Sequence, residues 1–132
     1  MAVANLIDNG TEVLTGNDNV VIVDVFQSVR GGRTLDVTGY PHDVIKAGHV
    51  LIEETATKEY KSMPLDSAGT AYDSLPSGHK YAGVLIATIL KKRPFAGILV
   101  RGTVNPAAAP FDMTAILTDV RDALPLIDFR ED

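Results

Sequence analysis

The stretch YAGVLIATIL, residues 81–90, is the most apolar run of the chain. Its aliphatic and β-branched residues favour extended backbone, and Pro94 interrupts the chain shortly after it. A run this short that is apolar at nearly every position predicts a strand in the core. Residues 95–101 (FAGILVR) are expected to pair with it as a hairpin across Lys91-Lys92-Arg93.

Further strands are expected upstream and downstream of this pair. Residues 20–29 (VVIVDVFQSV) and 34–38 (TLDVT) flank Gly31-Gly32, and two β-prone runs around a pair of glycines predict a second hairpin. Shorter strands are predicted at residues 49–53, 59–63 and 126–130. Together with the central pair, these runs give about seven strands.

One short helix is predicted near the C-terminus. Asp112 or Thr114 can cap its first turn, and apolar side chains from Ala115 to Leu124 recur at helical spacing. Pro125 cannot continue a helix, so the helix is expected to end before it.

The composition favours strands along most of the chain. The 132 residues include 14 valines, 9 isoleucines and 11 threonines, whose branched side chains favour extended backbone, and 11 glycines and 7 prolines, which divide it into short pieces. The length is that of one domain. We therefore predict a mainly β fold (α+β with one short helix): a small β-barrel or sandwich-like domain over residues 20–132.

Residues 1–19 are predicted to form an extended N-terminal arm. They show no sustained strand or helix period, and they contain the turn signal Gly16-Asn17-Asp18-Asn19. The arm carries Val3, Leu6 and Ile7, and further apolar residues follow them, which is more than a solvated tail needs. Either the arm packs on its own domain, or it docks on a partner, where an extended segment can add a strand to a sheet edge.

Charge and composition argue against several classes of function. The net charge of −5 disfavours a surface for nucleic acid, and no cysteine is present for disulfides, thiol chemistry or zinc. No apolar run reaches the roughly 18 residues of a membrane-spanning helix, and no basic start with an apolar core marks a secretory signal. The apolar content is high for so small a domain, which suggests that part of it covers a subunit interface; the alternative is a dense core that holds the same residues.

No arrangement of reactive residues predicts an enzyme. His42, His49 and His79 are 7 and 30 residues apart, without metal-site spacing, so we expect their imidazoles to hydrogen-bond turn backbone instead of holding a metal. Glu53 and Glu54 should point to opposite faces of one strand. No serine lies in a Gly-x-Ser-x-Gly turn, and phosphate- and dinucleotide-binding glycine motifs are absent, so no cofactor is expected.

Basic residues gather in two short stretches. Lys91-Lys92-Arg93, with Arg101 nearby, is expected at a hairpin tip in water, and contact with an acidic partner surface is the alternative. Arg30-Gly31-Gly32-Arg33 also suggests RNA binding, but a single copy between two strands indicates a turn. Neither stretch predicts binding of nucleic acid.

Five stretches of the chain resemble one family. They are residues 45–52 (IKAGHVLI), 60–65 (YKSMPL), 75–89 (LPSGHKYAGVLIATI), 93–105 (RPFAGILVRGTVN) and 116–129, which end in ALPLIDF. A strand that begins at a glycine turn is followed by a polar loop and by the strand with Gly83-Val84-Leu85. This pattern is similar to the head-fibre and capsid-decoration proteins of tailed phages, including the lambda-like head-stabilising group. The match covers residues 45–130.

The resemblance implies a structural role in a virus particle. Such proteins sit outside the expanded head, often as trimers, and tie neighbouring capsid subunits together. The implied partners are the major capsid protein and further copies of this chain in a homotrimer, and the implied capsid-binding residues are Val3, Leu6 and Ile7 of the arm. The implied location is the host cytoplasm during assembly and the exterior of the virion afterwards, with no membrane, nucleic acid or cofactor involved.

Two other functions stay open. One is a different phage structural component, such as a neck, tail or fibre-attachment module. The other is a small-molecule or metal-binding β domain, or an enzyme, with a site assembled from His49, His79 and acidic residues. That last possibility requires a deep pocket with convergent polar groups.

Overall fold

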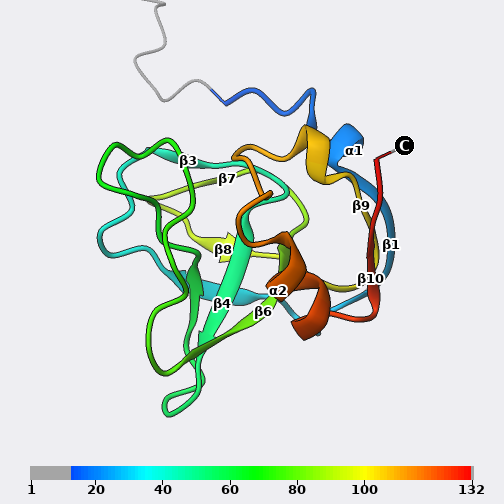
Figure 1. The fold of residues 1–132 in the computed structure, drawn as a ribbon. Coiled ribbons are helices and arrows are strands. Elements are labelled where there is room, and N and C mark those ends of the chain that lie inside the picture. The colour runs from blue at the N-terminus through cyan, green and yellow to red at the C-terminus, as the bar shows by residue number, and fades with distance from the viewer. Residues whose placement is uncertain (1–12, 132) are drawn as a thin grey trace, which may run out of the picture.

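The computed structural model describes residues 13–131, and Figure 1 shows that most of the ordered elements are strands. In chain order the elements are α1 (Asp18–Val21), β1 (Ile22–Ser28), β2 (Arg33–Asp36), β3 (Val44–Ile45), β4 (Val50–Glu54), β5 (Tyr60–Ser62), β6 (His79–Leu85), β7 (Ile89–Leu90), β8 (Phe95–Ala96), β9 (Ile98–Val104), a 3₁₀ turn η1 (Pro106–Ala108), α2 (Leu117–Ala123) and β10 (Ile127–Phe129). The expected shorter strands are confirmed as β4, β5 and β10.

One curled sheet contains most of these strands. Its strand order is β1-β9-β6-β4-β5-β2-β8, β10 pairs with β9 in parallel, and β3 and β7 form a separate pair. Only Gly97 separates β8 from β9, so the two ends of this order lie along nearly the same stretch of chain. The sheet therefore curls back toward itself as a half-barrel, and the predicted mainly β, barrel-like fold is confirmed.

The central pair of the sheet is the one that the apolar run predicts. β6 and β9 are antiparallel, with Val84 opposite Leu99 and Leu85 opposite Ile98. The run does not stay in one strand, however, because β6 ends at Leu85 and β7 pairs with β3 instead. The chain turns away where Thr88 binds the carboxylate of Asp18, a contact between residues 70 positions apart.

Both faces of the central strands are buried. On β4, Val50 and Ile52 belong to one apolar cluster, while Leu51 between them belongs to a second cluster on the other face. Successive side chains of a strand point to opposite faces, so both sides of this sheet must be covered. Double burial explains why the central strands are apolar at consecutive positions and not at alternate ones.

The predicted hairpin around Gly31-Gly32 is wrong. The two glycines do form a turn, with φ of +75° and +67°, and the Gly32 amide donates to the carbonyl of Val29. However, β1 pairs with β9, and β2 pairs with β8 and β5, so the turn joins two strands that do not pair with each other. The reason is that β1, the turn and β2 run together along the continuous segment β8–β9, which offers both strands a longer partner.

The predicted helix is confirmed in position but begins later than expected. α2 starts at Leu117, and Asp112 instead closes a local turn by accepting hydrogen bonds from the amide and hydroxyl of Thr114. Val120 and Leu124 are buried against the sheet, and α2 contacts β6 and β10. In Figure 1, α2 covers the face of the sheet formed by β4 and β6.

The close approach of β1 to β9 requires a residue without a side chain at Gly102. A Cβ at this position would lie 2.2 Å from the backbone oxygen of Asp24, and φ is +158°. Gly102→Ala should therefore push β1 away from β9 and lower the free energy of unfolding by about 2–4 kcal/mol. Gly16→Ala is the control, because a Cβ there meets no atom within 4 Å and should change stability by less than about 0.5 kcal/mol. Equal urea midpoints for the two variants would contradict this account.

Candidate functional site

The capsid-binding residues predicted in the arm, Val3, Leu6 and Ile7, lie outside the described residues. The described end of the arm is fastened to the domain. Lys46 Nζ donates to the carbonyl of Leu14 at 2.9 Å, and Asn17 Nδ2 donates to the carbonyl of Ala108 at 3.1 Å. Leu14 and Asn17 are therefore held on the domain, with Asn17 beside η1.

Asp18 makes the strongest contact of this segment. Its carboxylate accepts a 2.6 Å hydrogen bond from the Thr88 hydroxyl and a 3.0 Å bond from the Thr88 amide. The same hydroxyl oxygen accepts from the amide of Ala47 at 3.1 Å. Hydrogen bonds to a carboxylate are roughly twice as strong as neutral ones, so Asp18 joins the arm to the end of the central apolar run.

All three histidines hydrogen-bond backbone carbonyl groups, as predicted. The contacts are His42 Nε2 to the Gly69 oxygen at 2.7 Å, His49 Nε2 to the Met63 oxygen at 3.0 Å, and His79 Nδ1 to the Ser77 oxygen at 3.1 Å. Within residues 13–131, no three His, Asp or Glu side chains gather in a group that could hold a metal ion. His42 and His49 thus each join two separate backbone segments, whereas His79 bonds its own turn.

His49 is fully buried in an aromatic cluster. Its ring centroid lies 5.6 Å from Tyr40, 5.1 Å from Tyr72 and 5.6 Å from Phe111, all with edge-on geometry. Burial lowers the pKa of His49 to about 4, although the bond to the Met63 carbonyl opposes the shift. The neutral ring donates from Nε2, which leaves Nδ1 as a buried acceptor with no hydrogen-bond partner.

The carboxylates of Glu53 and Glu54 are adjacent in the sequence but have different partners. Glu53 is almost buried and forms an ion pair with Lys80, with 3.5 Å between Nζ and Oε1. Glu54 accepts a hydrogen bond from the hydroxyl of Thr57 at 2.9 Å. Neither carboxylate is paired with the other for general acid–base work.

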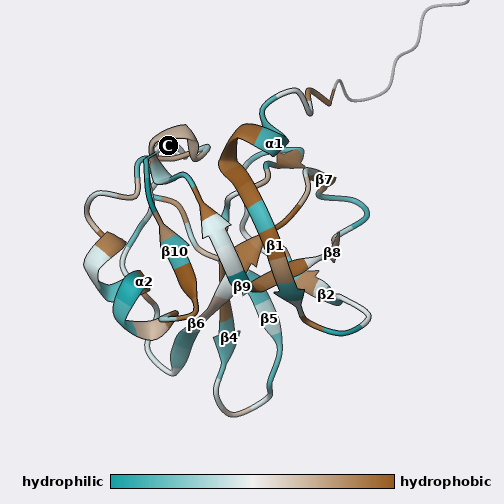
Figure 2. Cartoon of the chain, turned by 90° about the vertical axis from the view of Figure 1, so that its right-hand side faces the viewer, coloured by the Kyte–Doolittle hydropathy of each residue, from teal (hydrophilic) through white to brown (hydrophobic). Residues whose placement is uncertain are grey.

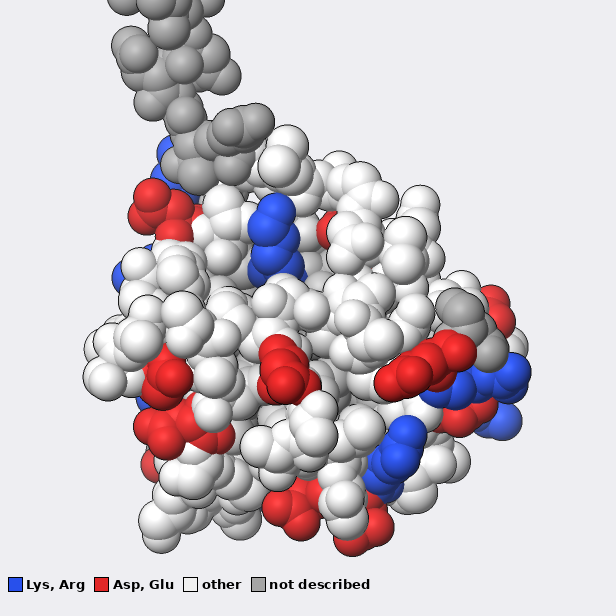
Figure 3. Space-filling model, turned by 45° about the horizontal axis from the view of Figure 1, so that its top comes forward, with Lys and Arg blue, Asp and Glu red and all other residues white. Residues whose placement is uncertain are grey.

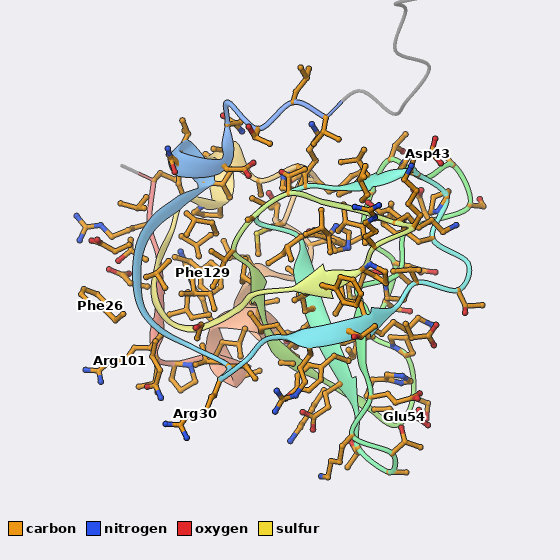
Figure 4. All side chains as sticks on the ribbon, turned by 180° about the vertical axis from the view of Figure 1, so that it is seen from behind. Phe26, Arg30, Asp43, Glu54, Arg101 and Phe129 are labelled. Atoms are coloured by element: carbon orange, nitrogen blue, oxygen red, sulfur yellow. The ribbon has the colours of Figure 1, made fainter. Side chains whose placement is uncertain are left out.

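The most exposed apolar surface lies on β1. Six of its seven residues are exposed, and Val23, Val25 and Phe26 are apolar, with Phe26 70% exposed. β9 pairs with one side of β1, and no described strand pairs with the other side. Figure 4 shows Phe26 directed away from the molecule, near Arg30 and Arg101, and Figure 2 shows β1 at the front of the sheet with apolar residues along it.

A second exposed apolar feature lies next to this strand. Phe95 on β8 is 69% exposed. It lines a shallow hollow of about 590 Å³ together with Gly31, Gly32, Arg33 and nearby backbone. The glycines carry no side chains, so the backbone at the floor of this hollow is accessible.

The basic stretch at residues 91–93 is divided between two roles. Lys91 Nζ donates a 2.6 Å hydrogen bond to the carbonyl of Tyr40, which makes it part of the structure. Lys92 and Arg93 are exposed in the turn between β7 and β8, as expected of a tip in water. On the face seen in Figure 3, acidic and basic side chains are interspersed among uncharged ones, so this face has no continuous basic strip for a phosphate backbone.

Comparison with known proteins adds no relative. No protein-family model, curated protein or solved structure matches this chain. None of the helices in residues 13–131 is long and apolar enough to cross a membrane.

The sequence indicated an apolar surplus but not its position. Residues 20–29 have the composition of a buried strand, yet β1 is exposed on both faces. The available signal was Asp24 and Gln27 inside that run, since a charged and an amide side chain seldom occupy a doubly buried strand. The aromatic cluster around His49 had no sequence signal, because its members come from four separate connections between elements.

Protonation of His49 should lower the stability of the folded protein in mild acid. The unfolded chain binds the His49 proton near pH 6.5 and the folded chain only near pH 4, so stability is full above pH 6.5 and is lost as the pH falls toward 4. The free energy of unfolding should drop by roughly 3 kcal/mol more in the parent protein than in His49→Gln between pH 7 and pH 4.

His79→Gln is the matched control for this measurement. Its ring is only partly buried and bonds a nearby turn carbonyl, so the variant should follow the pH profile of the parent protein. Urea unfolding at several pH values measures all three proteins. Parallel profiles for the parent protein and His49→Gln would refute the assignment.

Proposed function

We propose that this chain is a structural protein of a tailed-phage virion that binds the outside of the expanded capsid, as a homotrimer, and stabilises it. Its partners are the major capsid protein and other copies of itself. A ligand that binds only one state of a lattice stabilises that state by mass action, and many modest contacts add up over a shell. The protein is made in the host cytoplasm and ends on the exterior of the particle.

The observation that carries the proposal is the pattern of residues 45–130, which resembles capsid-decoration and head-fibre proteins. The exposed edge strand supports it. A protein that works alone protects or covers its sheet edges, whereas β1 presents Val23, Val25 and Phe26 on an edge that no strand within residues 13–131 pairs with. Such a surface suits a protein whose work is assembly.

The arm gives the capsid a second point of contact. Asn17 and Asp18 are bound to Ala108 and Thr88 of the domain, and we assign residues before them to the capsid contact. An arm held in this way can add a strand to an edge of the capsid lattice, where backbone hydrogen bonds set the register. Val3, Leu6 and Ile7 are the side chains that we assign to this contact.

The alternative structural role is a neck, tail or fibre-attachment module. It uses the same exposed surfaces, so copy number distinguishes it from decoration. A site for a small molecule or metal has less support, because among residues 13–131 no group of metal-ligating side chains surrounds the buried His49, and His79 bonds its own turn.

Copy number on particles tests the proposal. DNA-filled heads and unexpanded shells are purified from a strain that produces the phage, and this chain is quantified against the major capsid protein. We expect near-equimolar amounts on full heads and little on unexpanded shells. A few copies per particle would move the protein to the neck or tail, and absence from particles would refute a virion role.

A variant of the arm refines the same experiment. Replacing Val3, Leu6 and Ile7 together by Asp should reduce the amount on full heads at least tenfold while the free protein stays folded. Asp128→Asn is the control, because this exposed residue lies in β10, far along the chain from the arm. Equal occupancy by the two variants would remove the arm from the capsid contact.

A further inference from the structure

The exposed apolar residues of β1 lie among basic ones. Val23, Val25 and Phe26 are exposed on this strand, Arg30 follows its end by two residues, and Arg101 is exposed on the neighbouring strand β9. We call these five residues the β1 surface. Figure 4 shows Phe26, Arg30 and Arg101 along one edge of the molecule, all directed away from it.

We propose that the β1 surface binds an acidic, apolar segment of a different protein, whose carboxylates meet Arg30 and Arg101 and whose apolar side chains cover Phe26. The inference goes beyond the proposed function and does not require it. Where that function holds, the segment belongs to the capsid, and the β1 surface is the face of the domain that is turned toward the lattice.

Two β-bulges present the apolar side chains of this surface. Against β9, β1 has one extra residue at Val23 and another at Phe26, and neither has an opposite residue on β9. A bulge re-aims the side chain of the extra residue, and bulges are frequent next to functional sites. A bulged edge is also poorly suited to pairing with a further strand. The contact of the β1 surface is therefore made by side chains, and not by backbone hydrogen bonds to an added strand.

The composition of the β1 surface is that of a protein interface. Phe26 is 70% exposed, and Val23 and Val25 extend the apolar area beside it. Aromatic residues and arginine are enriched at interfaces, where a few of them supply most of the binding free energy. Covering Phe26 removes a large apolar side chain from water, so a partner with apolar side chains of its own gains most at this position.

The two arginines determine the charge of the partner. Within residues 13–131, no ion pair or hydrogen bond engages the guanidinium group of Arg30 or of Arg101. A guanidinium group binds a carboxylate through two parallel hydrogen bonds, and it is more weakly hydrated than an ammonium group. Carboxylates of a partner are therefore the groups that best match Arg30 and Arg101.

Asp24 restricts where the charges of the partner lie. It is exposed on β1 opposite Thr103, whereas Arg101 and Arg30 lie toward the other end of the strand. A nucleic acid carries a phosphate at every step and would bring negative charge against Asp24 as well. A protein segment can place carboxylates opposite the arginines alone, and such complementarity fixes its orientation along β1.

A pair of synthetic peptides tests the chemistry in solution. In one short peptide glutamate and leucine alternate, and in the other lysine replaces glutamate. Fluorescence anisotropy of the labelled peptides measures their binding to the parent protein. We expect the glutamate peptide to bind at least tenfold more tightly than the lysine peptide, with an affinity that falls as NaCl is added, because salt screens exposed charges. Equal affinities, or no binding of the glutamate peptide, would overturn the inference.

Charge reversal locates the contact on the protein. Arg30→Glu with Arg101→Glu should weaken binding of the glutamate peptide at least tenfold. Lys92→Glu with Arg93→Glu is the matched control, because it reverses two charges in the exposed turn between β7 and β8, and it should weaken binding less than threefold. The same loss in both double variants would mean a response to net charge and would refute the assignment.

Variants at Phe26 test the apolar part of the contact. Phe26→Asp should weaken binding of the glutamate peptide at least tenfold, while Phe26→Leu keeps an apolar side chain and should weaken it less than threefold. Phe95→Asp is the control, because Phe95 is 69% exposed on β8, outside the β1 surface. These side chains are largely exposed in the single chain, so circular dichroism should stay unchanged. Equal effects of Phe26→Asp and Phe95→Asp would contradict the proposal.

The same variants on full heads separate this inference from the proposed function. If the parent protein occupies heads, and the variant of Arg30 and Arg101 matches it both there and in binding the glutamate peptide, the inference fails and the function stands. If the parent protein is absent from particles but the peptide results hold, the function fails and the inference stands. If charge reversal instead lowers self-association in sedimentation, or binding to duplex DNA, without changing peptide binding, the occupant is a second copy or a nucleic acid, and the inference is overturned.

Discussion

Val84 and Leu85 are neighbours in β6 but belong to different apolar clusters, one on each face of the sheet. The remaining structure follows from the need to cover both faces. α2 and β10 contribute Val120, Ile127 and other buried residues to one cluster. On the other side, Tyr40 and Ile45 from the β2–β4 connection complete the second cluster. A domain of this size has few elements to spare, and these two layers use nearly all of them.

β1 is the strand that this arrangement leaves uncovered. It pairs with β9 beside Gly102, but no described element packs over Val25 or Phe26. Burying an apolar side chain gives about 25 cal/mol per Å² of surface removed from water, so an exposed edge of this kind favours association. The same shortage of covering elements that shapes the core thus accounts for a surface suited to assembly.

The polar contacts fix the segments that the core does not hold. Asp18 binds Thr88, and His49 binds the Met63 carbonyl inside an aromatic cluster, so long connections are held at single points. Asp18 accepts two hydrogen bonds from Thr88, and His49 is sealed from solvent. Asp18 fixes the described end of the arm on the domain, and His49 helps to position the loops near Phe111.

Local hydrophobic pattern and turn residues are enough to predict the class of fold, the central pairing of β6 with β9, the strands β4, β5 and β10, and the place of α2. The sequence also indicated that the histidines bond backbone. Two features depend instead on the tertiary structure. The two strands joined by the Gly31-Gly32 turn do not pair with each other, and β1 is exposed on both faces. Strand partners and burial depend on which distant segments compete for the same edge. Apolar composition alone therefore cannot distinguish a strand inside a core from an exposed strand at the edge of a sheet.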